Sequence, residues 1–181
     1  MEKSHKNYDV LIIGAGPAGA NAAISYRNLN PNLTVGLIDK AIFPRDKSCG
    51  DAIGPGVISA LKRFNNEHIL DGEPQVVSTT LYGPDNIGIQ NYIPEVKNKE
   101  DSIVYVIPRV DLDNRILDLA KECGVDVYEG YSFVDFTSNL DKSLNVQIKN
   151  ENQNLEFLTK ILIGADGANS RIRKKLNYKS N

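Results

Sequence analysis

Tyr8-Asp9-Val10-Leu11-Ile12-Ile13-Gly14-Ala15-Gly16-Pro17-Ala18-Gly19 is the stretch that decides the fold of this chain. Its β-branched first half is typical of a strand buried on both faces, and its second half is a complete G-x-G-x-x-G. A helical segment follows through residues 20–29, and a second apolar strand, 33–38, ends at Asp39. A glycine-rich turn in an unrelated α/β protein is the alternative, but strand, glycines, helix, strand and acid in this order favour a dinucleotide-binding unit.

Each residue type in this unit has a physical reason. Gly14 permits a tight turn, Gly16 lets the backbone approach a pyrophosphate, and Gly19 lets the helix pack close to the strand. The start of the helix offers free N–H groups to phosphates. Asp39 is placed to accept hydrogen bonds from a ribose and would repel a 2′-phosphate, which favours FAD or NAD over NADP. The predicted cofactor-binding residues here are Gly14, Gly16, Pro17, Ala18, Gly19, Asp39 and Lys40.

Composition excludes several classes of protein. The chain has 181 residues, 41% of them hydrophobic, and 21 basic against 23 acidic residues, so it lacks the basic excess of a nucleic-acid-binding protein. No apolar run approaches the roughly 20 residues that span a bilayer, and no signal peptide is recognisable. Cys49 and Cys123 form no disulfide framework, and His5 and His68 have no metal-ligand pattern around them. We therefore expect a cytoplasmic, reduced protein without a metal site.

Three later segments separate FAD from NAD by resemblance. The first, residues 43–57, contains Phe43-Pro44-Arg45-Asp46-Lys47-Ser48-Cys49-Gly50-Asp51. It resembles the F-P-R-x-K-x-C-G-D stretch of the geranylgeranyl reductase family of FAD-dependent oxidoreductases, which is related to flavin hydroxylases and halogenases. The resemblance implies that Arg45, Cys49 and Gly50 contact the cofactor and that Cys49 lies beside the reacting bond. An ordinary surface loop with a buried cysteine is the alternative.

The second and third segments resemble the same flavoproteins. In residues 103–113 a strand ends at Pro108, and Arg109, expected just ahead of an amphipathic helix, corresponds to an arginine that contacts FAD. In residues 161–173, Gly-Ala-Asp-Gly-x-x-Ser-x-x-Arg implies that Asp166, at the end of a buried strand, binds a ribityl hydroxyl and that Gly167 allows close approach. An exposed arginine at a helix start and an Asp-Gly hairpin turn are the respective alternatives.

The expected fold is an α/β, Rossmann-like FAD-binding domain with a parallel sheet, a small antiparallel meander and the beginning of a substrate-domain β-sheet. Residues 1–75 and 103–181 are assigned to the FAD-binding domain, and 76–102 begin the substrate sheet, which continues into the strand at 103–107. The other expected elements are a helix at 54–64, strands at 76–82, 87–91 and 125–128, and meander strands at 133–136, 144–148 and 155–157. A charged stretch, 95–101, separates two of the substrate-sheet strands.

The resemblance also implies a function. Reduced FAD would pass a hydride to a double bond of an isoprenoid or lipid substrate, with NAD(P)H or another reductant as electron donor, and a membrane-derived substrate would bring peripheral membrane contact. A flavin monooxygenase or halogenase shares the same motifs, although the chain has no tryptophan for the W-x-W-x-I-P segment of halogenases. The resemblance covers only the amino-terminal half of a usual family member. A non-catalytic FAD-binding fragment, or half of a split enzyme with a complementing carboxy-terminal polypeptide, therefore stays open.

Overall fold

The computed structural model describes residues 6–92 and 104–176. By packing, the chain divides into two compact units, one combining Met1–Arg45 with Asp113–Asn181 and the other formed by Asp46–Leu112. The functional division into an FAD-binding domain and a substrate sheet at residues 76–102 stays a prediction. The charged stretch 95–101 and residue 103 lie outside the described residues.

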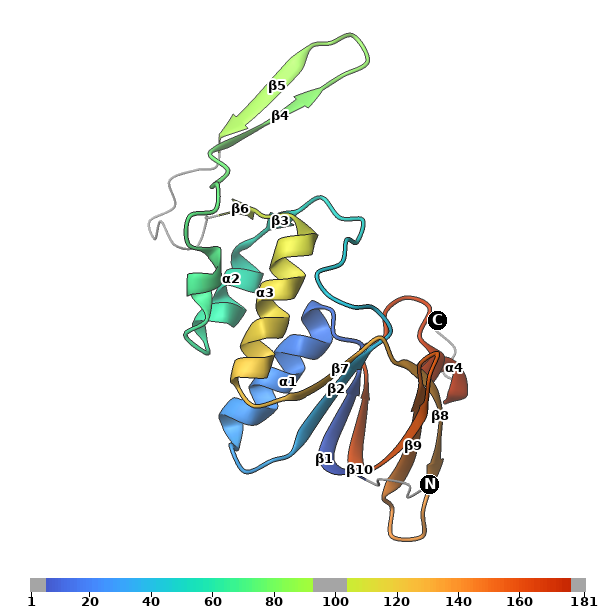
Figure 1. Cartoon of the computed structure of the whole chain (residues 1–181). Coiled ribbons are helices and arrows are strands. Elements are labelled where there is room, and N and C mark those ends of the chain that lie inside the picture. Colours follow the sequence, from blue (N-terminus) through green and yellow to red (C-terminus); the bar gives the residue numbers. More distant parts are fainter. Residues whose placement is uncertain (1–5, 93–103, 177–181) are drawn as a thin grey trace. The chain divides into compact units, whose positions relative to one another are not determined.

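The first unit contains a six-stranded sheet with the order β7-β2-β1-β10-β9-β8 (Figure 1). Its strands β7, β2, β1 and β10 are parallel, and β9 and β8 are antiparallel additions at one edge. This arrangement confirms the α/β class, the third parallel strand and the antiparallel meander. The bounds are β1 Lys6–Ile13, α1 Pro17–Leu29, β2 Val35–Asp39, β7 Asp126–Glu129, β8 Ser132–Ser138, β9 Leu144–Lys149, β10 Asn154–Gly164 and α4 Arg171–Lys175.

The strand β10 corrects the prediction that a meander strand at 155–157 is separate from the buried strand that precedes Asp166. It runs unbroken from Asn154 to Gly164, pairing with β9 through its first half and with β1 along most of its length. The reason is that no glycine or proline interrupts the chain before Gly164, so nothing turns the backbone between the two halves. The end of β10 is also less buried than expected, since the side chain of Ile161 is 44% exposed.

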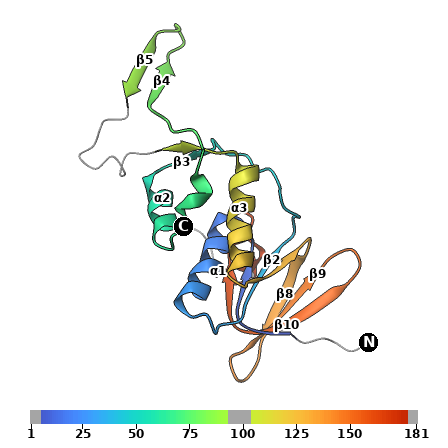
Figure 2. The same ribbon diagram turned by 60° about the vertical axis from the view of Figure 1, so that its left-hand side comes forward.

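An irregular hydrogen-bond pattern marks the middle of β1. The N–H groups of both Asp9 and Val10 donate to the carbonyl of Thr34. Strict alternation does not hold along β1, since Tyr8 and Leu11 both join the core cluster with Phe133, Val146, Ile148 and Phe157. On the α1 side, the buried Ala20 and Ala23 have small side chains, which lets α1 pack closely on β1 and β2 (Figure 2).

The carboxylate of Asp9, in β1, contacts Thr34, which precedes β2, and Lys160 of β10. It accepts hydrogen bonds from Thr34 N at 3.0 Å and Thr34 Oγ1 at 2.9 Å, and Lys160 Nζ donates to it at 2.7 Å. Lys160 and Thr34 lower the pKa of Asp9 from 3.8 to about 2. Because the folded-state pKa lies below the ordinary value, the stabilisation is present above pH 3.8 and is lost as the pH falls toward about 2.

We expect Asp9→Asn to lower the free energy of unfolding by roughly 1 kcal/mol at neutral pH, because it loses a charge-assisted hydrogen bond. The difference from wild type should shrink as acid protonates Asp9, which urea unfolding at neutral and acidic pH will measure. The control is Asp135→Asn, which removes the exposed pair of Asp135 with Lys175 and should have a smaller effect. Equal losses in the two variants would contradict the role of Asp9.

The second unit contains shorter elements. Its bounds are β3 Ala52–Ile53, α2 Pro55–Lys62, the 3-10 helix η1 Glu67–Leu70, β4 Ser78–Tyr82, β5 Gly88–Tyr92 and β6 Tyr105–Val106. Strands β4 and β5 form an antiparallel hairpin, seen as a two-stranded ribbon in Figure 2, and β3 pairs with β6. The predicted helix at 54–64 and the two predicted hairpin strands are thus present. Helix α3, Arg109–Glu122, begins in this unit and continues into the first one.

Candidate functional site

The ends of three parallel strands meet at the glycine turn in the first unit. Gly14 N donates to Ile38 O, and Ala165 N donates to Ile13 O, each at 2.7 Å. Gly14 has a φ of +104°, and a Cβ there would lie 2.3 Å from Ala165 O. A Cβ on Gly19 would lie 1.8 Å from Gly14 O. Only glycine therefore fits these two positions, which confirms the mechanical roles predicted for both.

The start of α1 presents backbone N–H groups to the space above the turn. Gly16 is the N-cap and Pro17 the first helical residue, so the position without an N–H falls where no intrahelical bond is lost. Neither a capping side chain nor an acidic residue occupies this first turn. The helix end thus keeps the free amides and the positive dipole end that bind phosphate.

The carboxylate of Asp39 holds the loops around the turn. Its Oδ2 accepts a hydrogen bond from Ala15 N at 2.7 Å, and its Oδ1 accepts one from Ala41 N at 2.8 Å. This is a role that the sequence analysis missed, although each carboxylate oxygen keeps a second lone pair for a ribose hydroxyl. The ribose contact itself stays a prediction, as does any contact from Lys40, whose side chain is exposed.

Arg45 lies beside the same turn. A Cβ built on Gly16 would be 3.4 Å from Arg45 Nη2, so the guanidinium lies next to the glycine at which the motif lets a pyrophosphate approach the backbone. Arg45 pairs with Asp113, at 3.2 Å between Nη1 and Oδ2, and its Cζ lies 4.8 Å from the centroid of the Phe43 ring. Arg45 was predicted from the sequence as a site residue, whereas Asp113 was not. The available signal was spacing, because Asp113 falls in register with the buried Ile116, Leu117 and Ala120 of the apolar helix face.

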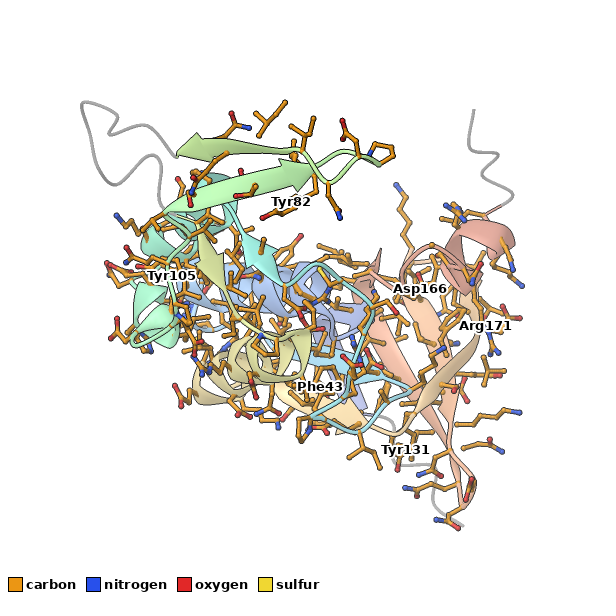
Figure 3. All side chains as sticks on the ribbon, turned by 90° about the horizontal axis from the view of Figure 1, so that it is seen from above. Phe43, Tyr82, Tyr105, Tyr131, Asp166 and Arg171 are labelled. Carbon is orange, nitrogen blue, oxygen red and sulfur yellow. The ribbon has the colours of Figure 1, made fainter. Side chains whose placement is uncertain are left out.

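Asp166 lies just after β10, next to the first residue of α4 (Figure 3). Its Oδ2 accepts a hydrogen bond from Arg171 N at 2.7 Å. Its Oδ1 is buried and has no hydrogen-bond partner among the described residues. A buried carboxylate oxygen without a donor is costly, so this atom is suited to receive a hydrogen bond from a ligand hydroxyl. Gly167, at φ +81°, has no described atom within 4 Å of a built Cβ, which leaves room for close approach.

Cys49 and Arg109 lie close together in the second unit, although they were predicted as site residues from two separate segments of the sequence. Cys49 is exposed, and the backbone N–H of Asp51, followed by the Arg109 guanidinium, lowers the pKa of its thiol below the usual range. Arg109 was expected just ahead of the helix, but it is the first residue of α3, because the helix begins directly after Pro108. Gly50 needs no glycine for its geometry, since it has no positive φ and no described neighbour within 4 Å of a built Cβ.

The reactivity of the two cysteines provides a test within one protein. Burial raises the pKa of Cys123, whereas that of Cys49 is lowered, so Cys49 should be alkylated faster by iodoacetamide at neutral pH. Arg109→Gln should slow the reaction of Cys49 and shift its pH midpoint upward, with Cys123 as the internal control. Peptide mass mapping at several pH values will measure both rates. A Cys49 rate unchanged by Arg109→Gln would show that the guanidinium does not stabilise the thiolate.

The first unit fits FAD by its own geometry. The glycine turn and the start of α1 suit a pyrophosphate, Asp39 lies at the end of the second strand where a ribose would bind, and the unpartnered Oδ1 of Asp166 suits a further hydroxyl. Asp166 Oδ1 can accept a hydrogen bond from a hydroxyl of the ribityl chain, which lies beyond the pyrophosphate in FAD. FAD would therefore be held by Gly14, Gly16, Asp39, Asp166 and Gly167.

Several known proteins are similar to this chain in sequence. The family model for the FAD binding domain matches residues 7–181. The menaquinone reductase of Mycolicibacterium smegmatis is 30% identical over 168 residues, covering 93% of this chain and 39% of that protein. The geranylgeranyl diphosphate reductase of Rhodobacter capsulatus is 29% identical over 171 residues, covering 93% of this chain and 40% of that protein. The chain thus spans about two fifths of the length of these relatives.

A solved structure has a similar fold to this chain. The p-nitrophenol 4-monooxygenase of Pseudomonas putida superposes with a TM-score of 0.83 at 14% identity, covering 95% of this chain and 44% of that one. This likeness shows the fold alone. The family match extends over nearly the whole sequence and carries the assignment: the chain belongs to the FAD binding domain family, with geranylgeranyl reductases among its homologues.

Proposed function

We propose that the chain is the FAD-binding part of an oxidoreductase that saturates carbon–carbon double bonds of an isoprenoid or lipid substrate. The observation that carries the proposal is the match to a geranylgeranyl diphosphate reductase over 93% of this chain. The loop with Cys49 and Gly50, which resembles that of the reductases, favours this reading over a monooxygenase or halogenase. NAD(P)H is the proposed source of electrons.

Different residues of the chain are proposed to bind different parts of FAD. When bound and reduced, FAD supplies the hydride for the double bond, with a proton added at the other carbon. Backbone amides at Gly16, Ala18 and Gly19 hold the pyrophosphate, and Asp39 with Lys40 holds the adenosine side. Asp166 and Gly167 hold the ribityl chain. Arg109 is proposed to contact FAD, as its motif implies.

Cys49 is proposed to lie beside the reacting double bond. Its thiol is exposed, and its lowered pKa brings its protonation change closer to neutral pH, where a group can exchange a proton during turnover. The lowered pKa has two main causes, the hydrogen bond from Asp51 N–H within the loop and the Arg109 guanidinium at the start of α3. Cys49→Ala should therefore keep FAD binding and lower the rate of substrate reduction.

Full activity is proposed to need a polypeptide equivalent to the rest of the relatives. The β4–β5 hairpin and its flanks expose apolar side chains, each between 65% and 75% exposed: Val77, Leu81, Tyr82, Ile87 and Ile89. A two-stranded sheet is marginally stable alone, and both its edges can accept further strands. About three fifths of each relative lies outside the matched region and could supply them.

Contact with a membrane surface is proposed only through the substrate. Within the part of the chain that the structure describes, no helix combines the length and the apolar composition needed to cross a bilayer. A lipid substrate is proposed to reach the enzyme from a membrane surface or a carrier.

The test is reduction of geranylgeranyl diphosphate by the chain loaded with FAD and reduced with dithionite. A mass gain of two hydrogens per saturated bond supports the proposal, either for the chain alone or after addition of the carboxy-terminal part of a relative. No gain in either case contradicts it. Oxygen insertion with NADPH and air, in place of saturation, would favour the monooxygenase.

A further inference from the structure

The ion pair between Arg45 and Asp113 is unusual in its burial. The Asp113 side chain is fully buried, that of Arg45 is 19% exposed, and their closest atoms are 3.2 Å apart. Two charges removed from water gain little net stability from each other, and apolar replacements are often at least as stable. The pair therefore calls for an explanation beyond the stability of the fold, and its position supplies one.

Three neighbours fix the guanidinium of Arg45. Asp113 binds it at one edge, the ring of Phe43 lies 4.8 Å from its centre, and Nη2 would lie 3.4 Å from a Cβ built on Gly16. The segment itself is anchored, because Phe43 N donates to Glu129 Oε2 at 2.9 Å. Since Gly16 is the N-cap of α1, the guanidinium is held at the turn whose amides are suited to phosphate.

We infer that Asp113 is a positioning residue for binding the pyrophosphate: it orients Arg45 at Gly16, so that Arg45 contacts a phosphate of the dinucleotide. An arginine has five N–H donors in a fixed plane, so one edge can bind Asp113 while others remain for a phosphate. Holding the side chain in place in advance removes the entropy cost of ordering it when the ligand binds. The inference rests on the FAD binding of the proposed function.

The test compares ADP with adenosine, because the two differ only in their phosphates. Isothermal titration of the full chain should show that Asp113→Asn weakens ADP about tenfold and adenosine less than about twofold, as expected when one charge-assisted contact is lost. FAD affinity, measured by flavin fluorescence, should fall in parallel with that of ADP. The salt dependence of ADP binding should also become shallower, because a positioned cation has been lost.

A double variant separates positioning from stability. Arg45→Met alone removes the guanidinium that pairs with the buried Asp113 carboxylate, so it should lower both the unfolding temperature and ADP affinity. Arg45→Met with Asp113→Asn should recover the unfolding temperature but not the affinity, and Asp113→Asn should add no further loss of ADP binding once Arg45→Met is in place. This comparison stays decisive if Asp113→Asn alone is unstable, because the double variant removes both charges of the pair.

Three results would overturn the inference. They are wild-type ADP affinity in Asp113→Asn, an equal loss for ADP and adenosine, and an additional loss of ADP binding on top of Arg45→Met. Each leaves FAD binding by the wild-type chain intact and so spares the proposed function. A folded wild-type chain that binds neither ADP nor FAD contradicts both.

Discussion

Gly19→Ala is expected to abolish measurable FAD binding and to destabilise the first unit. A Cβ at this position would lie 1.8 Å from the carbonyl oxygen of Gly14, which is backbone and cannot move aside as a side chain can. Relief requires α1 to shift away from the turn, at a cost of about 3 kcal/mol or more. Because the same turn binds the pyrophosphate, we expect FAD affinity to fall about a hundredfold or more.

A matched control is available at Gly56, which also lies in the first turn of a helix that begins with proline. A Cβ there meets no described atom within 4 Å, so Gly56→Ala should bind FAD as wild type does and be stabilised slightly, by up to about 1 kcal/mol. Flavin fluorescence quenching and thermal unfolding will measure both variants. If Gly19→Ala bound FAD within a factor of about three of wild type, the turn would not be the pyrophosphate site.

The glycine turn could be predicted because its constraints are local. The contacts of Gly14 and Gly19 follow from the strand–turn–helix connection, which the motif encodes within a few residues. The same holds for Pro17 at the start of α1 and for Gly124, which follows α3 with a φ of +79°. In each case the residue type reflects a backbone requirement that no distant segment can change.

The contacts that were missed depend on segments far apart in the chain. Nothing near Arg45 in sequence indicates that Asp113 will pair with it, and the meeting of Cys49 with Arg109 likewise depends on tertiary structure. The joined strand β10 was missed for a different reason: its two halves have different neighbours and therefore different hydrophobic patterns. The hydrophobic pattern alone predicts two strands here, because apolar and polar residues alternate in one half, whereas the other half is continuously apolar.

Asp166→Ala is expected to weaken FAD binding about tenfold to a hundredfold, with a smaller effect on stability. The substitution removes the buried Oδ1 that lacks a described partner, and a hydrogen bond from a ligand hydroxyl to a carboxylate contributes about 1.5–3 kcal/mol. It also removes the bond from Arg171 N to Oδ2, which supports the start of α4. The affinity of ADP, which has no ribityl chain, should change little, so the ratio of FAD to ADP affinity is the quantity to measure.

Ser170→Ala separates the two roles of Asp166. The Ser170 hydroxyl accepts a hydrogen bond from Arg173 N at 2.9 Å, so its loss weakens α4 without touching the buried Oδ1 of Asp166. We expect a loss of about 1 kcal/mol in stability and an unchanged ratio of FAD to ADP affinity. If Ser170→Ala lowered that ratio as much as Asp166→Ala, Asp166 would act only through the helix. A selective loss in Asp166→Ala would instead mean that the carboxylate recognises the part of FAD that ADP lacks, as expected for a contact with the ribityl chain.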